Sequence, residues 1–361
     1  ARSFVPGGLG GWVIYNKSDP LAPLSLTIEA DERISARGEV LSKLKVGQLA
    51  KDIKELSNKG VEAITVSLIN SFANDKHEKQ IRSVIKKKKL LPKIPVSLSS
   101  EVVPEMQEYE RTETTVVNSY VRPQVAKYVT NLQNSLQDKM GSDVNLAILR
   151  SDGGLASGRA AAESPVNLLL SGPAGGVAGA MYFCQRGGFE NILTFDMGGT
   201  STDVCHYSGE YERSFETEVA GVRIRAPMMQ INTVAAGGGS ILSFKEGRFQ
   251  VGPESAGAIP GPASYGRDGP LTVTDCNVLL GKLNPDYFPK VFGKNSNEPL
   301  NIKIVKAKFL SLSESIAKQT GKPKMDIVSM AEGFLRIAIE NMANAIKKIS
   351  IQRGYDITGY T

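Results

Sequence analysis

A two-glycine turn between two apolar runs, with an aspartate on each side, constrains this chain more than any other feature. The turn is Gly198-Gly199; it follows the run Ile192–Phe195 and leads through three hydroxyl residues to Asp203. Glycine has no Cβ and reaches backbone angles closed to other residues, so its N–H groups can approach a polyphosphate closely. The stretch Asp196–Asp203 therefore predicts a phosphate-binding hairpin, with an ordinary two-glycine β-turn as the alternative.

The other residues of this stretch fit phosphate chemistry as well. The hydroxyl groups of Thr200, Ser201 and Thr202 can donate hydrogen bonds to phosphate oxygens. Asp196 stands where a carboxylate can hold the water shell of a Mg²⁺ ion that bridges phosphate oxygens. We therefore expect this stretch to bind a nucleotide through its phosphates.

Composition excludes several classes of protein. The chain has 361 residues, enough for two or three domains, and a net charge of +6. Much of the excess charge lies in the run Lys86–Lys89, which is typical of a solvated helix end, so we expect no nucleic-acid binding. No apolar run reaches the roughly 20 residues that a membrane span needs, so we expect no membrane partner.

Histidine and cysteine usage narrows the chemistry further. With two histidines, a histidine-based metal centre or a Ser-His-Asp triad is nearly excluded. The three cysteines Cys184, Cys205 and Cys276 are far apart, which argues against a disulfide framework or a zinc site. This pattern favours a reducing, cytoplasmic location. Cys205 and its neighbour His206 are interpreted as packing or surface residues.

Apolar periodicity predicts alternating helices and strands in the first hundred residues, which is the α/β signature. After a glycine-rich opening and an extended segment at Trp12–Tyr15, the expected helices are Val46–Leu56 and Asp75–Ile85, and the expected strands are Val61–Ile69 and Pro95–Leu98. The charged connector Glu101–Arg111 is interpreted as the domain boundary, which gives domains 1–110 and 111–361.

Two long helices are expected in the second domain. The first runs from Thr112 to Leu136, bent at Pro123, with Val117, Tyr120, Tyr128, Leu132 and Leu136 as its apolar stripe. The last helix has one apolar face from Ile327 to Ile349. The segment Lys290–Leu312 is expected to be polar and irregular.

Small residues and glycine mark the loops between these helices. Ser171–Ala180 predicts a helix, either with an anion-binding N-terminus or in close contact with a neighbouring helix. Val204–Tyr207 and Glu210–Glu218 are expected to pair as strands, and Ile231–Val234 leads into the glycine loop Ala235–Ser240. Thr272–Asp275 begins a helix that Asp275 can cap.

Six of these segments together resemble the hydantoinase A / 5-oxoprolinase family, whose catalytic domain belongs with actin, the sugar kinases and the heat-shock chaperones. They occur in the family's order and are Glu108–Thr112, Ser151–Leu155, Leu170–Val177, Phe195–Asp203, Ala235–Ser240 and Val251–Gly257. The resemblance implies an α/β chain with part of an actin-like, ribonuclease-H-like ATPase fold, a smaller N-terminal α/β portion and glycine loops rich in β-hairpins. Residues 1–110 then correspond to the C-terminal part of the family's N-terminal domain, and 111–361 to its catalytic domain, truncated at the C-terminus.

The resemblance also implies an activity: ATP-dependent ring-opening of a cyclic amide, such as 5-oxoproline or a hydantoin, by phosphorylation of the amide oxygen. Family members carry one further phosphate strand before the position of Ala1 and one further nucleotide loop after that of Thr361, so the chain is expected to be a fragment. A hydantoinase B-type subunit or domain is the implied partner, and an oligomer is expected.

The implied site is carried over residue by residue. Asp196 and Asp203 are expected to arrange Mg²⁺ through water and to be the catalytic carboxylates. Asp152 and Glu254 are candidates near the substrate. The residues expected to hold ATP are Gly198, Gly199, Thr200, Ser201, Thr202, Gly237, Gly238, Gly239 and Ser240.

Two other functions remain open. Related subunits serve ATP-dependent ketone carboxylases of the acetone or acetophenone type, and nothing in these residues separates a lactam from a ketone. A non-catalytic assembly module that kept the fold and lost nucleotide use is the second alternative.

Overall fold

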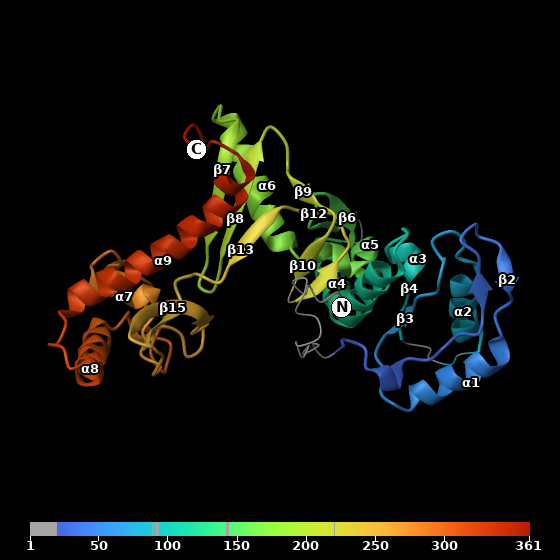
Figure 1. Cartoon of the computed structure of the whole chain (residues 1–361), viewed down its shortest axis with the longest axis horizontal. Helices are drawn as coiled ribbons and strands as arrows, with labels where there is room; N and C mark the ends of the chain where they lie inside the picture. Colours follow the sequence, from blue (N-terminus) through green and yellow to red (C-terminus); the bar gives the residue numbers. More distant parts are fainter. Residues whose placement is uncertain (1–19, 89, 91–93, 142–143, 220) are drawn as a thin grey trace, which may run out of the picture. The chain divides into compact units, whose positions relative to one another are not determined.

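The computed structural model describes residues 20–88, 90, 94–141, 144–219 and 221–361 (Figure 1). The predicted extended segment Trp12–Tyr15 and Lys89 of the lysine run lie outside the described residues. The chain forms two compact units: unit 1 comprises Ala1–Ser171 and Arg213–Met228, and unit 2 comprises Gly172–Glu212 and Met229–Thr361. The predicted boundary at 110/111 falls inside unit 1 and stays a prediction.

Unit 1 begins with a small α/β layer, as the apolar periodicity predicts. Helices α1 (Val46–Ser57) and α2 (Lys76–Lys87) confirm the two expected helices. Strands β3 (Ile64–Val66) and β4 (Val96–Leu98) pair in parallel and are shorter than expected. Their core is aliphatic, because Ile53, Val66, Ile81, Ile85 and Leu98 pack together out of water. A short antiparallel pair, β1 (Arg33–Ile34) and β2 (Val40–Ser42), precedes this layer.

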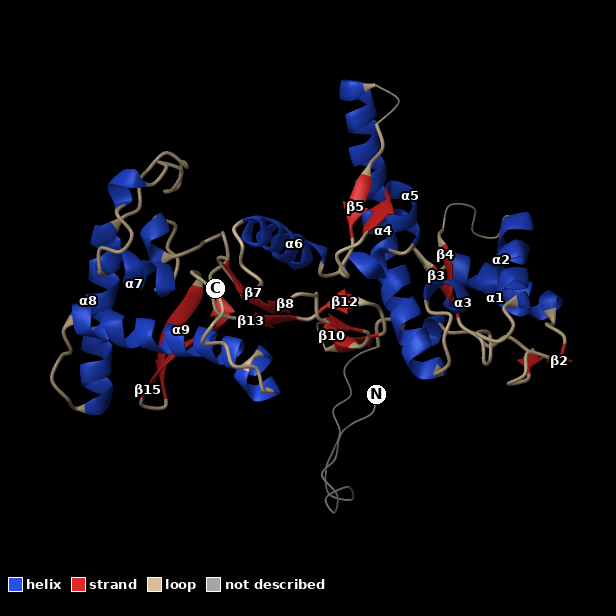
Figure 2. Cartoon of the chain, turned by 90° about the horizontal axis from the view of Figure 1, so that it is seen from above, coloured by secondary structure: helices blue, strands red, loops and turns tan. Residues whose placement is uncertain are grey.

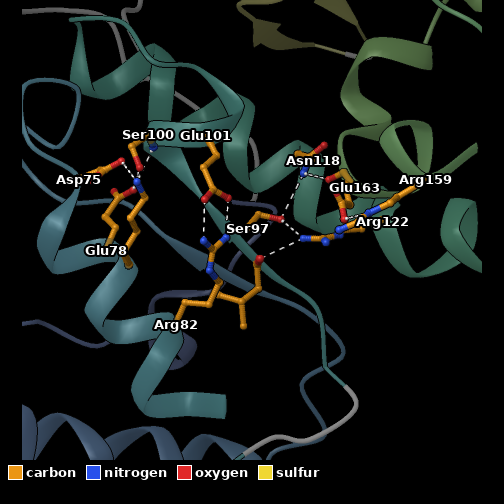
Figure 3. A network of polar contacts seen from close by, with 12 residues as sticks. Asp75, Glu78, Arg82, Ser97, Ser100, Glu101, Asn118, Arg122, Arg159 and Glu163 are labelled. Atoms are coloured by element: carbon orange, nitrogen blue, oxygen red, sulfur yellow. Dashed lines mark hydrogen bonds and ion pairs between the residues drawn. The ribbon is translucent and has the colours of Figure 1, made fainter. Parts of the chain in front are cut away.

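A polar network fastens this layer to its neighbours (Figure 3). Glu78 of α2 is fully buried and accepts hydrogen bonds from the Ser99 hydroxyl (2.6 Å) and from the Ser100 amide (3.0 Å). Both serines lie in α3 (Ser99–Val102). Arg122 of α4 donates to the Val96 carbonyl (3.0 Å) and the Ser97 hydroxyl (3.2 Å). The buried carboxylate is thus satisfied by hydrogen bonds, as burial of a charge requires.

Helix α4 (Glu108–Met140) continues through Pro123 and confirms the expected long helix, but its predicted apolar stripe is wrong in part. Val117 is buried, whereas Tyr120 and Tyr128 are 67% and 65% exposed. The contact to α5 (Gly158–Glu163) is made instead by Val129, whose side chain lies against Gly158. The helical spacing predicts one apolar stripe, but the position of α5 decides which side of this helix is covered.

The rest of unit 1 consists of hairpins and short turns around α4. Strands β5 (Ala147–Leu149) and β6 (Leu155–Ser157) form one antiparallel hairpin, and β10 (Thr217–Val219) and β11 (Val222–Ile224) form another. The second hairpin adds Ile224 to a buried cluster that contains Val117 of α4. Strand β9 (Arg213–Ser214) also belongs to this part of the chain.

A three-stranded antiparallel sheet, in the order β13-β8-β7, is the centre of unit 2. The strands are β7 (Asn191–Met197), β8 (Thr202–Ser208) and β13 (Ile231–Val234). Helices α6 (Ser171–Arg186) and α9 (Ile327–Ile349) pack on its opposite faces, α6 through Met181 onto Ile192 and α9 through Ala345 onto Val204 (Figure 2). The chain is therefore mixed α/β, and both helices confirm their predictions.

One predicted strand pairing is wrong. The segment 204–207 was expected to pair with 210–218, but β8 lies between β7 and β13 and pairs with both. The following segment meets it through a bridge between Tyr207 and Tyr211. The pairing with β7 explains this result. The turn at Gly198 places β7 along one edge of β8, and β13 pairs along its other edge, so both edges of β8 are occupied by other strands.

The second core of unit 2 lies between the hairpin β14 (Ser240–Lys245) with β15 (Arg248–Ser255) and three helices: α7 (Val273–Leu279), α8 (Ile302–Thr320) and α9. Phe309 and Phe334 are fully buried in it. The prediction of an irregular segment at 290–312 is wrong from Ile302 on. The lysines of this segment make it look polar, so the helical spacing of Val305 and Phe309 is hard to recognise. The Asn301 side chain caps the helix by accepting a hydrogen bond from the Ile304 amide (3.1 Å).

Contacts of the buried His206 and of Glu212 hold the last residues of the chain to β8. His206 bonds Glu212 through Nδ1 (2.9 Å) and the Tyr360 hydroxyl through Nε2 (2.8 Å), and its ring stacks on Tyr355 at 4.1 Å. Arg353 forms an ion pair with Glu212. Burial raises the pKa of the Glu212 carboxyl, but hydrogen bonds from Tyr355, Arg353 and His206 lower this pKa more, so the net shift is downward.

The three cysteines of the described residues are unpaired, and burial makes the thiols of two of them unreactive. Burial raises the pKa of the Cys205 thiol to about 12, and that of Cys276 to about 12 as well. A thiol that stays protonated at neutral pH is a poor nucleophile. Cys205 and His206 are both buried, which agrees with the packing role expected for them. Across the described residues, no helix is both long enough and apolar enough to cross a lipid bilayer.

The lowered pKa of Glu212 has a measurable effect on stability. A carboxyl whose pKa is lower in the folded state stabilises the fold above its unfolded pKa, about 4.3, and this contribution is lost as the pH falls through the folded value. Replacing Glu212 with Gln should lower the melting temperature at pH 6 by several degrees, and the difference from wild type should shrink towards pH 3. The exposed Glu210→Gln serves as control. A difference that does not depend on pH would contradict this assignment.

Candidate functional site

The predicted hairpin is present at the end of the unit 2 sheet. Asp196 on β7 is the direct partner of Asp203 on β8, and Met197 pairs with Thr202. The turn is closed by the Gly198 amide, which donates to the Ser201 carbonyl (2.9 Å). Gly198, Gly199 and Thr200 are exposed. The structure thus confirms a hairpin with one aspartate on each strand, one residue pair away from an open glycine turn.

The two aspartates lie on the face of the sheet that α6 covers. Ile192 packs against α6, and residues two apart on a strand share a face, so Asp196 belongs to the same face. Asp203 and its partner Thr233 on β13 continue this row across the sheet. The Thr233 hydroxyl donates to Asp203 Oδ1 (2.5 Å). Sequence reasoning missed Thr233, although the alternation of Ile231–Val234 places it on this face.

Helix α6 brings a bare backbone to the same place. A Cβ on Gly176 would stand 3.7 Å from Asp196 Oδ2, and that oxygen is the nearest group it would meet. Asp196 is exposed, so its carboxylate faces solvent beside a helix side without side chains. The described contacts of this small-residue helix include the sheet, where Met181 packs on Ile192 and Gly176 lies beside Asp196. Both interpretations given for it from the sequence stay predictions.

The donor set at the turn fits a hydrated Mg²⁺ ion. Mg²⁺ prefers carboxylate oxygens and keeps several waters, so one or two protein carboxylates suffice. Asp196 and Asp203 supply that pair, and the described residues contain no group of three or more histidine, cysteine, aspartate or glutamate side chains placed to hold a metal. A Cβ on Gly199 would meet nothing within 4 Å, so the turn also has open space for a ligand.

The glycine loop 235–240 packs its backbone directly on the turn. The Gly238 amide donates to the Gly198 carbonyl (3.1 Å), and the Gly239 amide donates to the Gly199 carbonyl (2.6 Å). A Cβ on Gly237 would stand 2.8 Å from the Gly198 oxygen, closer than real Cβ contacts occur. The loop therefore requires glycine because two main chains touch. The amides of Gly238 and Gly239 hold the turn, and a contact of this loop with ATP stays a prediction.

Two predicted hydroxyl ligands are engaged inside the protein. Thr202 is fully buried, and its hydroxyl donates to the Ala236 carbonyl (2.6 Å). Ser240 is also buried, and its hydroxyl accepts a hydrogen bond from the Gly237 amide (2.9 Å). Thr200 is exposed and Ser201 is half-buried. The hydroxyl groups nearest to solvent are thus those of Thr200 and Ser201.

The two substrate candidates lie in different units. Asp152 is in the turn between β5 and β6 of unit 1, where its carboxylate accepts from the Gly154 amide (2.9 Å) and pairs with Arg150 (2.9 Å). Glu254 is exposed on β15 of unit 2. The structure gives the position of each residue only within its own unit. The role of either residue at a substrate stays a prediction.

Substituting Gly237 with Ala should disturb the contact between the two glycine segments. The new methyl group would overlap the Gly198 oxygen and the main-chain carbons of Gly199 and Thr200, which lie within 2.9 Å of its position. Overpacking of this kind typically costs about 1–3 kcal/mol. Gly199→Ala, whose methyl group meets nothing, is the matched control. Urea unfolding measures both, and equal stability of the two variants would refute the contact.

The chain matches the Hydantoinase/oxoprolinase family over residues 111–361 and the Hydantoinase/oxoprolinase N-terminal region over residues 11–89. It is 38% identical to the 5-oxoprolinase of Saccharomyces cerevisiae over 308 residues, which are 85% of this chain and 23% of the yeast protein. It is 33% identical to the caprolactamase subunit alpha of Pseudomonas jessenii, covering 95% of this chain and 48% of that subunit.

A solved structure shows the same likeness in three dimensions. The nucleotide-free structure of acetone carboxylase superposes with a TM-score of 0.78 at 26% identity, over 96% of this chain and 48% of that one. The chain therefore spans about a quarter of the yeast relative and about half of the other two. Since the family match covers most of the residues, the chain belongs to the hydantoinase/oxoprolinase family.

Proposed function

We propose that this chain carries the phosphate-binding part of an ATP-dependent enzyme that opens a cyclic amide of the 5-oxoproline or hydantoin type. The observation that supports this most is the pair Asp196 and Asp203 beside an open glycine turn. Relatives named 5-oxoprolinase and caprolactamase support a cyclic amide as the substrate class. The actin-like ATPase fold, ATP and Mg²⁺ belong to the same proposal.

Phosphoryl transfer depends mainly on positioning and on neutralising charge. In this proposal the exposed amides of the turn bind phosphate oxygens, and the hydroxyl groups of Thr200 and Ser201 add further donors. Asp196 and Asp203 hold Mg²⁺ through water, and Thr233 keeps the Asp203 carboxylate in place. When bound, the metal would supply positive charge against the phosphate oxygens.

The chemistry explains why a nucleotide is needed. An amide carbonyl is a poor electrophile. When its oxygen bonds to the γ-phosphorus and the bond to ADP breaks, the carbonyl carbon becomes open to attack by water. Addition of one water and cleavage of the ring C–N bond give an acyl phosphate, and a second water hydrolyses it to the carboxylate and free phosphate. We assign the hydrolytic step to a hydantoinase B-type subunit or domain, and the relative named as a subunit alpha supports an assembly with a partner. A cytoplasmic location and an oligomeric state are part of this proposal.

A second function is favoured by one observation. The likeness to acetone carboxylase, with a TM-score of 0.78, supports an ATP-dependent ketone carboxylase, in which the same transfer would activate an enolate or carbonate. ATP turnover by the complete encoded protein with 5-oxoproline, hydantoin, or acetone plus bicarbonate separates the two. Stimulation by acetone alone among these would reject the amide. Calorimetric titration with Mg·ATP tests the alternative of a non-catalytic assembly module. If the chain is such a module, no heat of binding should be measured.

Substitution of Asp196 with Ala should abolish Mg²⁺-dependent ATP turnover in the complete encoded protein and leave it folded. Asp196 is exposed at the end of the sheet, so its loss removes a metal position without emptying a core site. Glu190→Ala, at an exposed carboxylate just before β7, is the matched control and should keep wild-type turnover. Steady-state turnover and melting temperature are measured together. Unchanged turnover in Asp196→Ala would defeat the assignment.

Gly176→Ala should weaken Mg·ATP binding severalfold without loss of stability. Its methyl group would stand 3.7 Å from Asp196 Oδ2, in the space that the water shell of the metal needs. Gly179→Ala on the same helix meets nothing within 4 Å and serves as control. Both changes should stabilise the helix, by roughly 0.5–1 kcal/mol. Calorimetry gives the two Kd values, and identical values would show that this space is not used.

A further inference from the structure

We infer that the loop Gly237–Gly239 is a backbone clamp that aims the amides of Gly199 and Thr200 at phosphate, and that Thr202 and Thr274 are the positioning residues that hold this clamp. The inference rests on the proposed function and deepens it. It assigns to the loop an indirect role in nucleotide binding, in place of the direct contact expected from the sequence.

The direction of the turn's amides follows from peptide geometry. In a trans peptide the C=O and N–H groups lie in one plane and point in opposite directions. The Gly198 and Gly199 carbonyls both accept hydrogen bonds from the loop, at 3.1 and 2.6 Å. The N–H groups of the same two peptides, which belong to Gly199 and Thr200, therefore point away from the loop, on the exposed side of the turn. Two adjacent amides aimed outward form an anion-binding arrangement.

Thr202 fixes the start of the clamp. It is the first residue of β8 after the turn, it is fully buried, and its hydroxyl donates to the Ala236 carbonyl at 2.6 Å. Because the next residue of β8 is Asp203, one hydroxyl ties the clamp to the strand that carries the carboxylate. This hydrogen bond joins the two segments through a side chain, whereas the contacts at Gly237 to Gly239 are between main chains.

Thr274 fixes the middle of the clamp from the opposite side. Its amide and its hydroxyl both donate to the Gly238 carbonyl, at 2.8 and 2.9 Å. Thr274 is held in turn by the first turn of α7, where Thr272 and Asp275 form a capping box. Asp275 is fully buried and also accepts from the Ser264 amide at 2.8 Å, so this support is rigid. Gly238 then donates its own amide to the hairpin turn.

The test uses Thr274, because it contacts the clamp and not the turn. Thr274→Val removes the hydroxyl and keeps the shape, and Thr274→Ser keeps the hydroxyl. In the complete encoded protein, Thr274→Val should raise KM for Mg·ATP about fivefold to tenfold, since the loss of a hydrogen bond to a held carbonyl loosens the aim of the amides. Thr274→Ser should restore the wild-type KM. We expect the same two results at Thr202: Thr202→Val should raise KM for Mg·ATP, and Thr202→Ser should restore the wild-type KM.

Thr320→Val is the matched control, because it removes a threonine hydroxyl that donates to the Ile316 carbonyl (2.7 Å) at the exposed C-terminal end of α8 in the same unit. A purely structural role would lower the melting temperature and kcat through the folded fraction, with KM unchanged, and that result in Thr274→Val overturns the inference. Because Thr274 is half-buried, its variants test the inference even if Thr202→Val does not fold. A raised KM in Thr202→Val alone would mean that its hydroxyl meets phosphate directly, which also overturns it. Absence of Mg·ATP turnover in wild type would instead refute the proposed function.

Discussion

The contact between two glycine segments, made main chain to main chain, is the interaction on which the candidate site depends. The turn at Gly198-Gly199 offers its carbonyls to the amides of Gly238 and Gly239, and no side chain separates them. A two-glycine turn alone would be among the least restricted parts of a chain, since glycine has the largest conformational freedom. The second segment removes that freedom and leaves the outer side of the turn open.

The rest of unit 2 supports this contact in layers. The sheet sets Asp196 opposite Asp203, α6 leaves space beside Asp196, and α9 covers the other face of the sheet. Behind the glycine loop, the first turn of α7 is fixed by its buried cap. The charge at the turn thus comes from the sheet, the open space from α6 and the rigidity from α7. Each of these properties can be altered by substitution without removing the others.

Local signals predicted much of this architecture. The hairpin at Asp196, the α1 and α2 helices and the long α9 helix follow from apolar spacing and from glycine, because these depend on near neighbours in sequence. Tertiary packing decided the rest. Tyr120 and Tyr128 are exposed because α5 covers a neighbouring side of their helix. The helix α8 is not predicted because its lysines make the segment look polar. The inward hydroxyl of Thr202 could not be predicted, since its acceptor, Ala236, lies far away in the chain.

The main-chain contact at Gly237 has a consequence for sequence variation. Where two side chains touch, a larger residue on one side can be offset by a smaller one on the other. Here each partner contributes only the atoms common to all residues, so a methyl group gained at Gly237 meets a carbonyl oxygen that no exchange at Gly198 can shorten. A side-chain exchange at Gly198 therefore cannot relieve an alanine at Gly237, and only a shift of one main chain or added stability elsewhere in the protein can offset it.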